Sequence, residues 1–195
     1  AGGVLAIRGE RQGQGQGGGN SAMVCPKPPG PVEKNKNPLE DFMTSEQWES
    51  LKNVPADHLI TSDNDPFPRP GTGDDEWQVV RITGVDEYYI SGGGAGGCRH
   101  TNPCKGLLIV DGDLEINGNF GWEGVIVTGG RVIGNGTKDI TGAVVTGAKR
   151  LAGQSVDQDQ GNGTKNYRYN SCSVFQASSA SYTVSRLPSS FYETR

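Results

Sequence analysis

The sequence predicts an all-β fold, a parallel β-solenoid whose three-sided coils contain about 18 residues each. Cut every six residues from Gly106, the chain reads as the blocks GLLIVD, GDLEIN, GNFGWE, GVIVTG, GRVIGN, GTKDIT and GAVVTG. Every block begins with glycine, and its third and fifth places are mostly apolar, which indicates a short strand with one buried face. Gly106, Gly124 and Gly142 open strongly apolar blocks 18 residues apart. Three six-residue sides are therefore predicted to close one coil.

The block frame assigns the corners and the core. Glycine can adopt the backbone angles of a corner, so the opening glycines are predicted to end the strands; they are Gly106, Gly112, Gly118, Gly124, Gly130, Gly136 and Gly142. The predicted solenoid core is Leu108, Val110, Leu114, Ile116, Phe120, Trp122, Ile126, Val132, Ile140 and Val144. Lys138 also occupies an inward place, and an unpaired buried lysine would be costly. We therefore expect a local bulge or a coil edge at Lys138.

The main solenoid is predicted to cover residues 76–150, and residues 1–25 to form one N-terminal coil of the same kind. The second prediction is based on Gly3 to Glu10, GVLAIRGE, which repeats the phrase GLLIVDGD that begins at Gly106. Stacking such coils buries the inward side chains of each against its neighbours.

Two further segments interrupt or end the repeat. Residues 26–75 are predicted to be a Pro/Lys-rich and acidic excursion, in which the capping box Thr44-Ser45-Glu46-Gln47 indicates a short helix at about 44–53. Residues 151–195 are predicted to be a C-terminal capping tail, with a last strand at Tyr167-Arg168-Tyr169 and a short helix from Ser171 to Ala180. Both segments are candidates to cover the ends of the solenoid, because open sheet ends invite edge-to-edge association.

Composition limits the classes of function. Only 33% of the 195 residues are hydrophobic, which favours a narrow core, and the net charge of −4 gives no support for nucleic-acid binding. No apolar run is long enough to cross a bilayer, so we expect no membrane span in this chain.

The four cysteines, Cys25, Cys98, Cys104 and Cys172, fit two disulfides in an oxidising compartment. Cys98 and Cys104 bracket a short loop, so a bridge between them is the easiest closure. That bridge would leave Cys25 to pair with Cys172, although sequence alone does not determine this second pairing. A zinc site is a weak alternative because there is no CxxC pair and there are only two histidines. We therefore expect an extracytoplasmic protein.

Motifs for catalysis are not found. The sequence contains no GxSxG, HExxH or P-loop pattern, so we expect no enzyme, no catalytic residue, no metal and no cofactor. A carbohydrate-active β-helix enzyme is the least favoured alternative; Asp111, Asp113 and Glu115 alternate and would share its outer face. The acidic loop from Ser62 to Glu76 lacks the EF-hand spacing that a calcium site would need. Hexapeptide acyltransferases place an aliphatic residue before each glycine, whereas this chain has mainly Asp, Asn, Glu and Thr there.

The run from Gly106 to Ala148 resembles the β-solenoid region of PilX-like type IV pilus assembly proteins. The closest matches are Gly112-Asp113-Leu114, Gly118-Asn119-Phe120 and Trp122-Glu123-Gly124, and the segment from Asn166 to Cys172 resembles the Y-x-Y-[DN]-S-C segment of that family. The resemblance implies a right-handed solenoid and a surface-exposed accessory protein of a type IV pilus or related secretion machinery. It supplies no catalytic residues.

The sequence thus predicts a non-enzymatic structural or adhesive module of a type IV pilus-like or cell-envelope assembly, outside the cytoplasm of a bacterium. Its expected partners are other protein subunits of that assembly. Two alternatives stay open: a DNA- or glycan-binding module at the cell surface, and an accessory subunit of another extracytoplasmic complex. A basic stripe on the surface would favour DNA.

Overall fold

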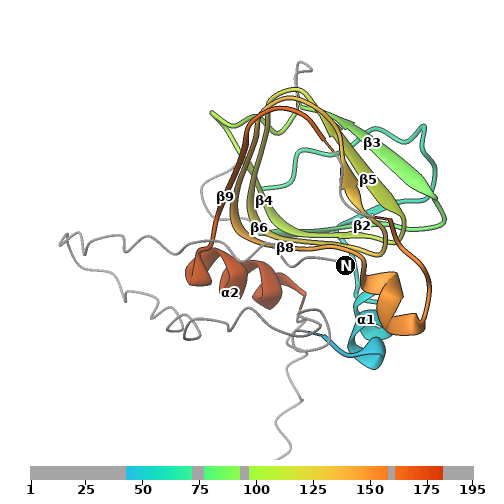
Figure 1. Ribbon diagram of the computed structural model, residues 1–195. Coiled ribbons are helices and arrows are strands. Elements are labelled where there is room, and N and C mark those ends of the chain that lie inside the picture. Colours follow the sequence, from blue (N-terminus) through green and yellow to red (C-terminus); the bar gives the residue numbers. More distant parts are fainter. Residues whose placement is uncertain (1–42, 72–76, 93–96, 158–160, 182–195) are drawn as a thin grey trace, which may run out of the picture.

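The computed structural model describes residues 43–71, 77–92, 97–157 and 161–181, which form two parallel β-sheets and two α-helices (Figure 1). Sheet A has the strand order β1 (His58–Ile60), β2 (Gln78–Ile82), β4 (Cys104–Val110), β6 (Phe120–Thr128), β8 (Lys138–Val145) and β9 (Lys165–Arg168). Sheet B consists of β3 (Glu87–Ser91), β5 (Asp113–Asn117) and β7 (Val132–Ile133). The helices are α1 (Ser45–Leu51), the 3₁₀ helix η1 (Ala148–Ala152) and α2 (Ser171–Ala180).

The predicted fold class, an all-β three-sided solenoid, is wrong. The chain forms a mixed arrangement in which two parallel sheets are combined with α-helices, and α2 packs against four strands of sheet A. Two of the predicted six-residue sides are not separate strands, because Phe120 to Thr128 runs through both of them as the single strand β6. The physical reason lies in Gly124, in the middle of that strand.

Gly106, Gly124 and Gly142 lie inside strands β4, β6 and β8 and do not end them, contrary to the prediction for these corner glycines. They have φ angles of 145°, 130° and 138° and pair with one another across the sheet. A glycine at positive φ lets the backbone bend while the hydrogen-bond ladder continues. Figure 1 shows these strands bending around one corner of the sheet.

The other predicted corner glycines lie between strands. Gly112 and Gly130 occupy the bends before β5 and β7, and Gly118 and Gly136 occupy bends with φ angles of 86° and 101°.

The strand register follows the predicted 18-residue spacing in the middle of the chain. Leu108 pairs with Ile126 and Ile126 with Val144, while Leu114 pairs with Val132 in sheet B. Earlier and later pairs are more widely spaced, for example Lys138 with Lys165. The spacing is therefore a property of the central strands only.

The inner core lies between the two sheets. Nine of the ten predicted core residues are buried in it, and Val144 is half-buried against it. Phe120 and Trp122 stack with their ring centroids 6.2 Å apart, and Phe67 packs against Trp122 from the loop after β1. The remaining buried members are Ile60, Val80, Ile82, Tyr88, Ile90, Cys98 and Cys104.

A second core covers the outer face of sheet A. Its strand residues include Val79, Leu107, Ile109, Val125, Val127 and Val145, and they are covered by Trp48 of α1, Ala148 of η1 and Ala177 of α2. Figure 1 shows α1 and α2 on this side of the sheet. The sequence contains the signal for this core, because GLLIV and GVIVT are apolar at consecutive positions, as expected for strands buried on both faces.

The predicted helices are confirmed. Thr44 caps α1: its side chain accepts a hydrogen bond from Gln47 N, and Gln47 Oε1 accepts one from Thr44 N at 2.8 Å, which completes the capping box. Helix α2 has the predicted bounds, and the Asn170 side chain caps it by accepting from Cys172 N and Ser173 N. The predicted last strand corresponds to β9.

Lys138 stays in the strand register with Phe120 and Lys165, so the expected bulge or edge at this residue is wrong. Its side chain is only 1% exposed, and Nζ donates a hydrogen bond to Gly134 O at 2.8 Å. That bond satisfies one donor of the buried ammonium group. Burial, together with the charge of Lys165, lowers the pKa of Lys138.

Several predictions fall outside the described residues. They are the N-terminal coil at 1–25, the first part of the excursion up to residue 42, Cys25, and the end of the capping tail beyond residue 181. The excursion does contribute β1 to sheet A, a strand that the sequence did not predict.

We expect alkaline unfolding to distinguish Tyr88 from its neighbour Tyr89. Tyr88 Oη donates to Asp65 O at 2.6 Å, and burial, followed by the charge of Asp65, raises the pKa of Tyr88 to about 12 from 10. Because the folded-state pKa lies above the unfolded value, this stabilisation is complete below pH 10 and is lost as the pH rises through 12.

Replacing Tyr88 with phenylalanine should lower the free energy of unfolding by about 1–2 kcal/mol at neutral pH, since Asp65 O loses its donor. It should also reduce the loss of stability between pH 10 and 12. Urea unfolding across this pH range provides the measurement. Tyr89→Phe, in which the ring is 51% exposed, is the control and should behave as wild type. If the free energy of unfolding of the two variants depended on pH in the same way, Tyr88 would not be the source of the stability lost between pH 10 and 12.

Candidate functional site

The candidate site is the outer face of sheet B. Burial alternates along β3 and β5, so every second side chain points away from the inner core. We define the face by Glu87, Tyr89 and Ser91 of β3, Asp113, Glu115 and Asn117 of β5, and Arg131, Ile133 and Asn135 in and around β7. The register places Glu87 beside Asp113, Tyr89 beside Glu115, and Ser91 beside Asn117.

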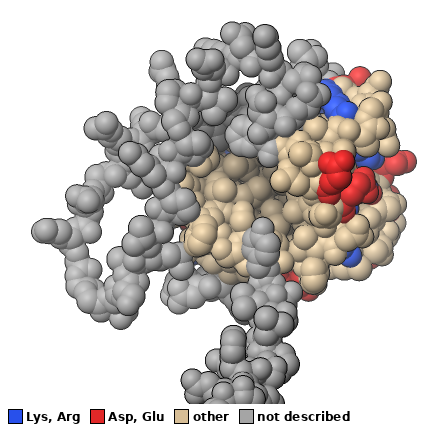
Figure 2. Space-filling model, turned by 90° about the horizontal axis from the view of Figure 1, so that it is seen from below, with Lys and Arg blue, Asp and Glu red and all other residues tan. Residues whose placement is uncertain are grey.

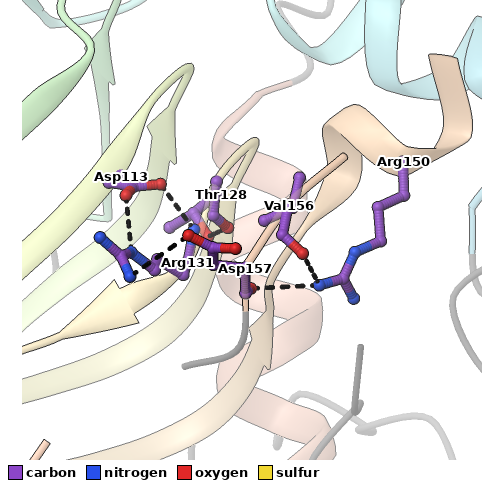
Figure 3. Close-up of polar contacts among 7 residues, drawn as sticks. Asp113, Thr128, Arg131, Arg150, Val156 and Asp157 are labelled. Atoms are coloured by element: carbon purple, nitrogen blue, oxygen red, sulfur yellow. Dashed lines mark hydrogen bonds and ion pairs between the residues drawn. The ribbon is translucent and has the colours of Figure 1, made fainter. Parts of the chain in front are cut away.

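One side of the face is an ion-pair network centred on Arg131 (Figure 3). Asp113 accepts from Arg131 N at 2.9 Å and from Arg131 Nε at 2.8 Å, and Arg131 Nη1 lies 3.7 Å from Asp157 Oδ2. The hydrogen bond to Asp113 is the main reason that the pKa of Arg131 is raised. Arg150 holds the segment after η1 by donating from Nη2 to the backbone oxygens of Val156 and Asp157.

This network requires a glycine next to it. A Cβ atom at Gly130 would lie 1.9 Å from Asp113 Oδ1, so only glycine leaves room for the carboxylate. Thr128, at the end of β6, donates from Oγ1 to Gly130 O at 2.8 Å and fixes the same bend.

The opposite side of the face is a row of amide side chains. Asn117 Oδ1 accepts from Asn135 N at 2.6 Å, and Asn135 Oδ1 accepts from Asn162 N at 3.2 Å. Asn117 Nδ2 also donates to Glu115 Oε1 at 2.6 Å, which orients this carboxylate. Hydrogen bonds of this kind link successive strands and make the face rigid.

Tyr89 lies between these two groups. Its ring is 51% exposed, and the side chains of Glu87 and Glu115 are its neighbours along the strand and across the sheet. The face carries three carboxylates, those of Glu87, Asp113 and Glu115, and one guanidinium, that of Arg131, so it is net acidic; Asp157 adds a further carboxylate next to it. An exposed ring in an acidic surface whose side chains are held by hydrogen bonds is suited to binding.

The sequence placed two of these carboxylates correctly. Asp113 and Glu115 share the face, whereas Asp111 lies in the bend before β5 and is not part of the strand. Sequence reasoning missed Tyr89 and Arg131 as site residues. A signal was present for Arg131, because it follows Asp113 by the same 18 residues that separate Asn117 from Asn135.

The predicted disulfide between Cys98 and Cys104 is confirmed. Both residues are fully buried with their Cα atoms 5.0 Å apart, and Cys104 pairs in register with Trp122. Gly121 N donates to Cys98 O, which anchors the disulfide loop to β6. Cys172 is also disulfide-bonded, and Cys25, its predicted partner, lies outside the described residues.

The described part of the chain offers neither a metal-binding cluster nor a helix that could span a membrane. These residues contain no group of three or more His, Cys, Asp or Glu side chains that could hold a metal ion. None of their helices is both long and apolar enough to span a membrane. In the acidic loop, Asp65 Oδ2 accepts from the backbone N–H groups of Thr61 and Ser62, so this carboxylate shapes the loop.

No protein-family model, curated protein or solved structure matches the chain. The resemblance to PilX-like proteins therefore rests on the sequence motifs alone, and the function has to be argued from the outer face of sheet B.

Proposed function

We propose that the chain is a non-enzymatic structural and adhesive module of an extracytoplasmic assembly, either pilus-like or in the cell envelope, and that it contacts its partner through the outer face of sheet B. The observation that carries this proposal is the difference between the two sheets. Helices cover the outer face of sheet A, whereas sheet B presents the exposed ring of Tyr89. Exposed aromatic rings at rigid positions are typical contact residues of protein interfaces.

The extracytoplasmic location is supported by the buried bridge between Cys98 and Cys104, since such bridges persist mainly in oxidising compartments. The motif resemblance to PilX-like proteins supports the same location and a partner that is a protein subunit.

The charge of the face argues against the DNA-binding alternative. A phosphate backbone is bound by lysine and arginine side chains, whereas this face is net acidic and its guanidinium, on Arg131, is paired with Asp113. The same pairing argues against the enzyme alternative, because the Asp113 carboxylate is already bound by two donors of Arg131.

Photo-cross-linking in the native cells tests the proposal. A photoreactive phenylalanine analogue at position 89 should form an adduct with an envelope protein, and the same analogue at position 175 should not. Phe175 is the matched control because its ring is 43% exposed but lies on α2. Thiol labelling of denatured, unreduced extracts of the same cells should leave Cys98 and Cys104 unmodified. Adducts of equal yield from both positions, or ready labelling of these cysteines, would contradict the proposal.

A further inference from the structure

We infer that the partner presents a lysine or arginine side chain to Tyr89, so that the outer face of sheet B is a docking surface for a cationic protein segment; this inference rests on the proposed function. The ring of Tyr89 is 51% exposed, and the carboxylates of Glu87 and Glu115 are its neighbours on the face. An ammonium or guanidinium group over an aromatic ring is attracted by the negative face of the π-system.

The charges around Tyr89 complement a cation. Arg131 is bound by Asp113 and Asp157, and no ion pair among the described residues involves Glu87 or Glu115. Hydrogen bonding from Asn117 to Glu115 comes from a neutral amide and leaves the carboxylate charge uncompensated. A cation at Tyr89 would therefore be close to the uncompensated charge of Glu115 and to Glu87, which forms no ion pair although its charge contributes to the raised pKa of Arg131.

The arrangement is also preformed. Asn117 holds Glu115 through a 2.6 Å hydrogen bond, and Asn117 is in turn held by Asn135 N. Tyr89 and Glu115 are paired in the ladder between β3 and β5, so their spacing is set by the backbone. A preformed surface loses less conformational entropy when a partner binds.

The side on which the helices lie also carries charge. Figure 2 shows a compact group of acidic side chains there, with basic side chains nearby, on the part of the described surface that the view leaves uncovered. Variants on the helices are therefore needed as controls for a contact at sheet B.

Binding of a short fluorescent peptide of alternating lysine and glycine to the full chain tests the inference, with the same peptide carrying acetylated lysines as the uncharged probe. The lysine peptide should bind and the acetylated one should bind at least about tenfold more weakly, since cation–π and charge attraction are both lost. Raising the salt concentration from about 0.05 to 0.5 M should weaken binding, because exposed charges are screened.

Variants of the full chain localise the contact. Tyr89→Ala should weaken binding of the lysine peptide by about 3- to 10-fold, and Glu87→Gln and Glu115→Gln by about 2- to 5-fold each. The matched controls are Phe175→Ala for the ring and Glu49→Gln for the charge, both on helices, and each should change the affinity less than twofold. Thermal unfolding of each variant shows whether it is folded.

Equal weakening by Glu49→Gln and Glu115→Gln would overturn the inference, because it would show that binding depends only on the net charge of the chain. Equal binding of the acetylated peptide, or binding of a neutral oligosaccharide such as maltoheptaose in place of the peptide, would also overturn it. If the position-89 cross-link forms in cells while the lysine peptide does not bind, the inference fails and the proposed function stands. If the cross-link fails as well, both are wrong.

Discussion

Replacing Gly124 with alanine is expected to prevent the chain from reaching its native state under ordinary conditions. A Cβ atom at Gly124 would lie 2.1 Å from Gly106 O in the paired strand and 3.1 Å from Ala177 Cβ in α2. The φ angle of 130° adds strain for any residue with a side chain. Backbone strain of about 1–2 kcal/mol and overpacking of about 1–3 kcal/mol together approach the whole stability of a small domain.

Gly153→Ala is the matched control for this prediction. Gly153 also has positive φ, at 76°, but a Cβ atom there would meet nothing within 4 Å. Its loss of stability should be about 1 kcal/mol, from backbone conformation alone. Urea or thermal unfolding followed by circular dichroism measures both variants. If Gly124→Ala unfolded at the same midpoint as Gly153→Ala, the close approach of β4 and β6 at their glycines would be wrong.

Trp48→Ala is expected to cost about 3–5 kcal/mol of stability, the second-largest effect that we predict. Trp48 is 1% exposed and lies in the outer core, with Leu107, Ile109 and Val127 of sheet A among its members. Removal of the indole would leave a cavity between α1 and the sheet, and the strand residues beneath it would lose their cover. Urea unfolding of the variant measures the loss.

Phe175→Ala provides the comparison for Trp48→Ala, because this α2 ring is 43% exposed. Its effect should stay within about 0.5 kcal/mol, as for most surface substitutions. A Trp48→Ala variant as stable as Phe175→Ala would mean that sheet A is stable without α1. The mixed sheet-and-helix description would then need revision.

Much of the strand pairing could be predicted from the sequence. The alternation of apolar residues identified the inward side chains of β5, and the 18-residue repeat paired Leu114 with Val132. Both patterns are local consequences of the extended backbone, in which successive side chains point to opposite faces. The capping box at Thr44 could also be predicted from the sequence, because N-cap hydrogen bonds involve only neighbouring residues.

The outer core could not be assigned in the same way. Leu107 and Val125 are apolar, but the outer core that contains them also includes Trp48, from a segment far earlier in the sequence. The residue pattern of one strand predicts that both of its faces are buried, but it does not predict which segment packs against the second face. Lys138 shows the same limit, since the oxygen that accepts its hydrogen bond belongs to a bend of particular geometry.

The sequence predicted only part of the candidate site. The carboxylates of Asp113 and Glu115 were recognised as sharing a face, but their roles differ: one is bound by Arg131 and the other remains next to Tyr89. Tyr89 belongs to an earlier strand that pairs with β5 outside the 18-residue spacing, so the repeat did not bring it to this face.

The sequence by itself determined the inward residues, the register of the central strands, the two helices and the bridge between Cys98 and Cys104. These features depend on alternation, repeat spacing and short loops, all of which are local. Only the tertiary structure decided that Gly124 bends a continuous strand, that helices cover sheet A, and that Tyr89 lies exposed between Glu87 and Glu115. Those outcomes depend on which distant segments pack together, and the free energy of that packing is not encoded in any one stretch of the chain.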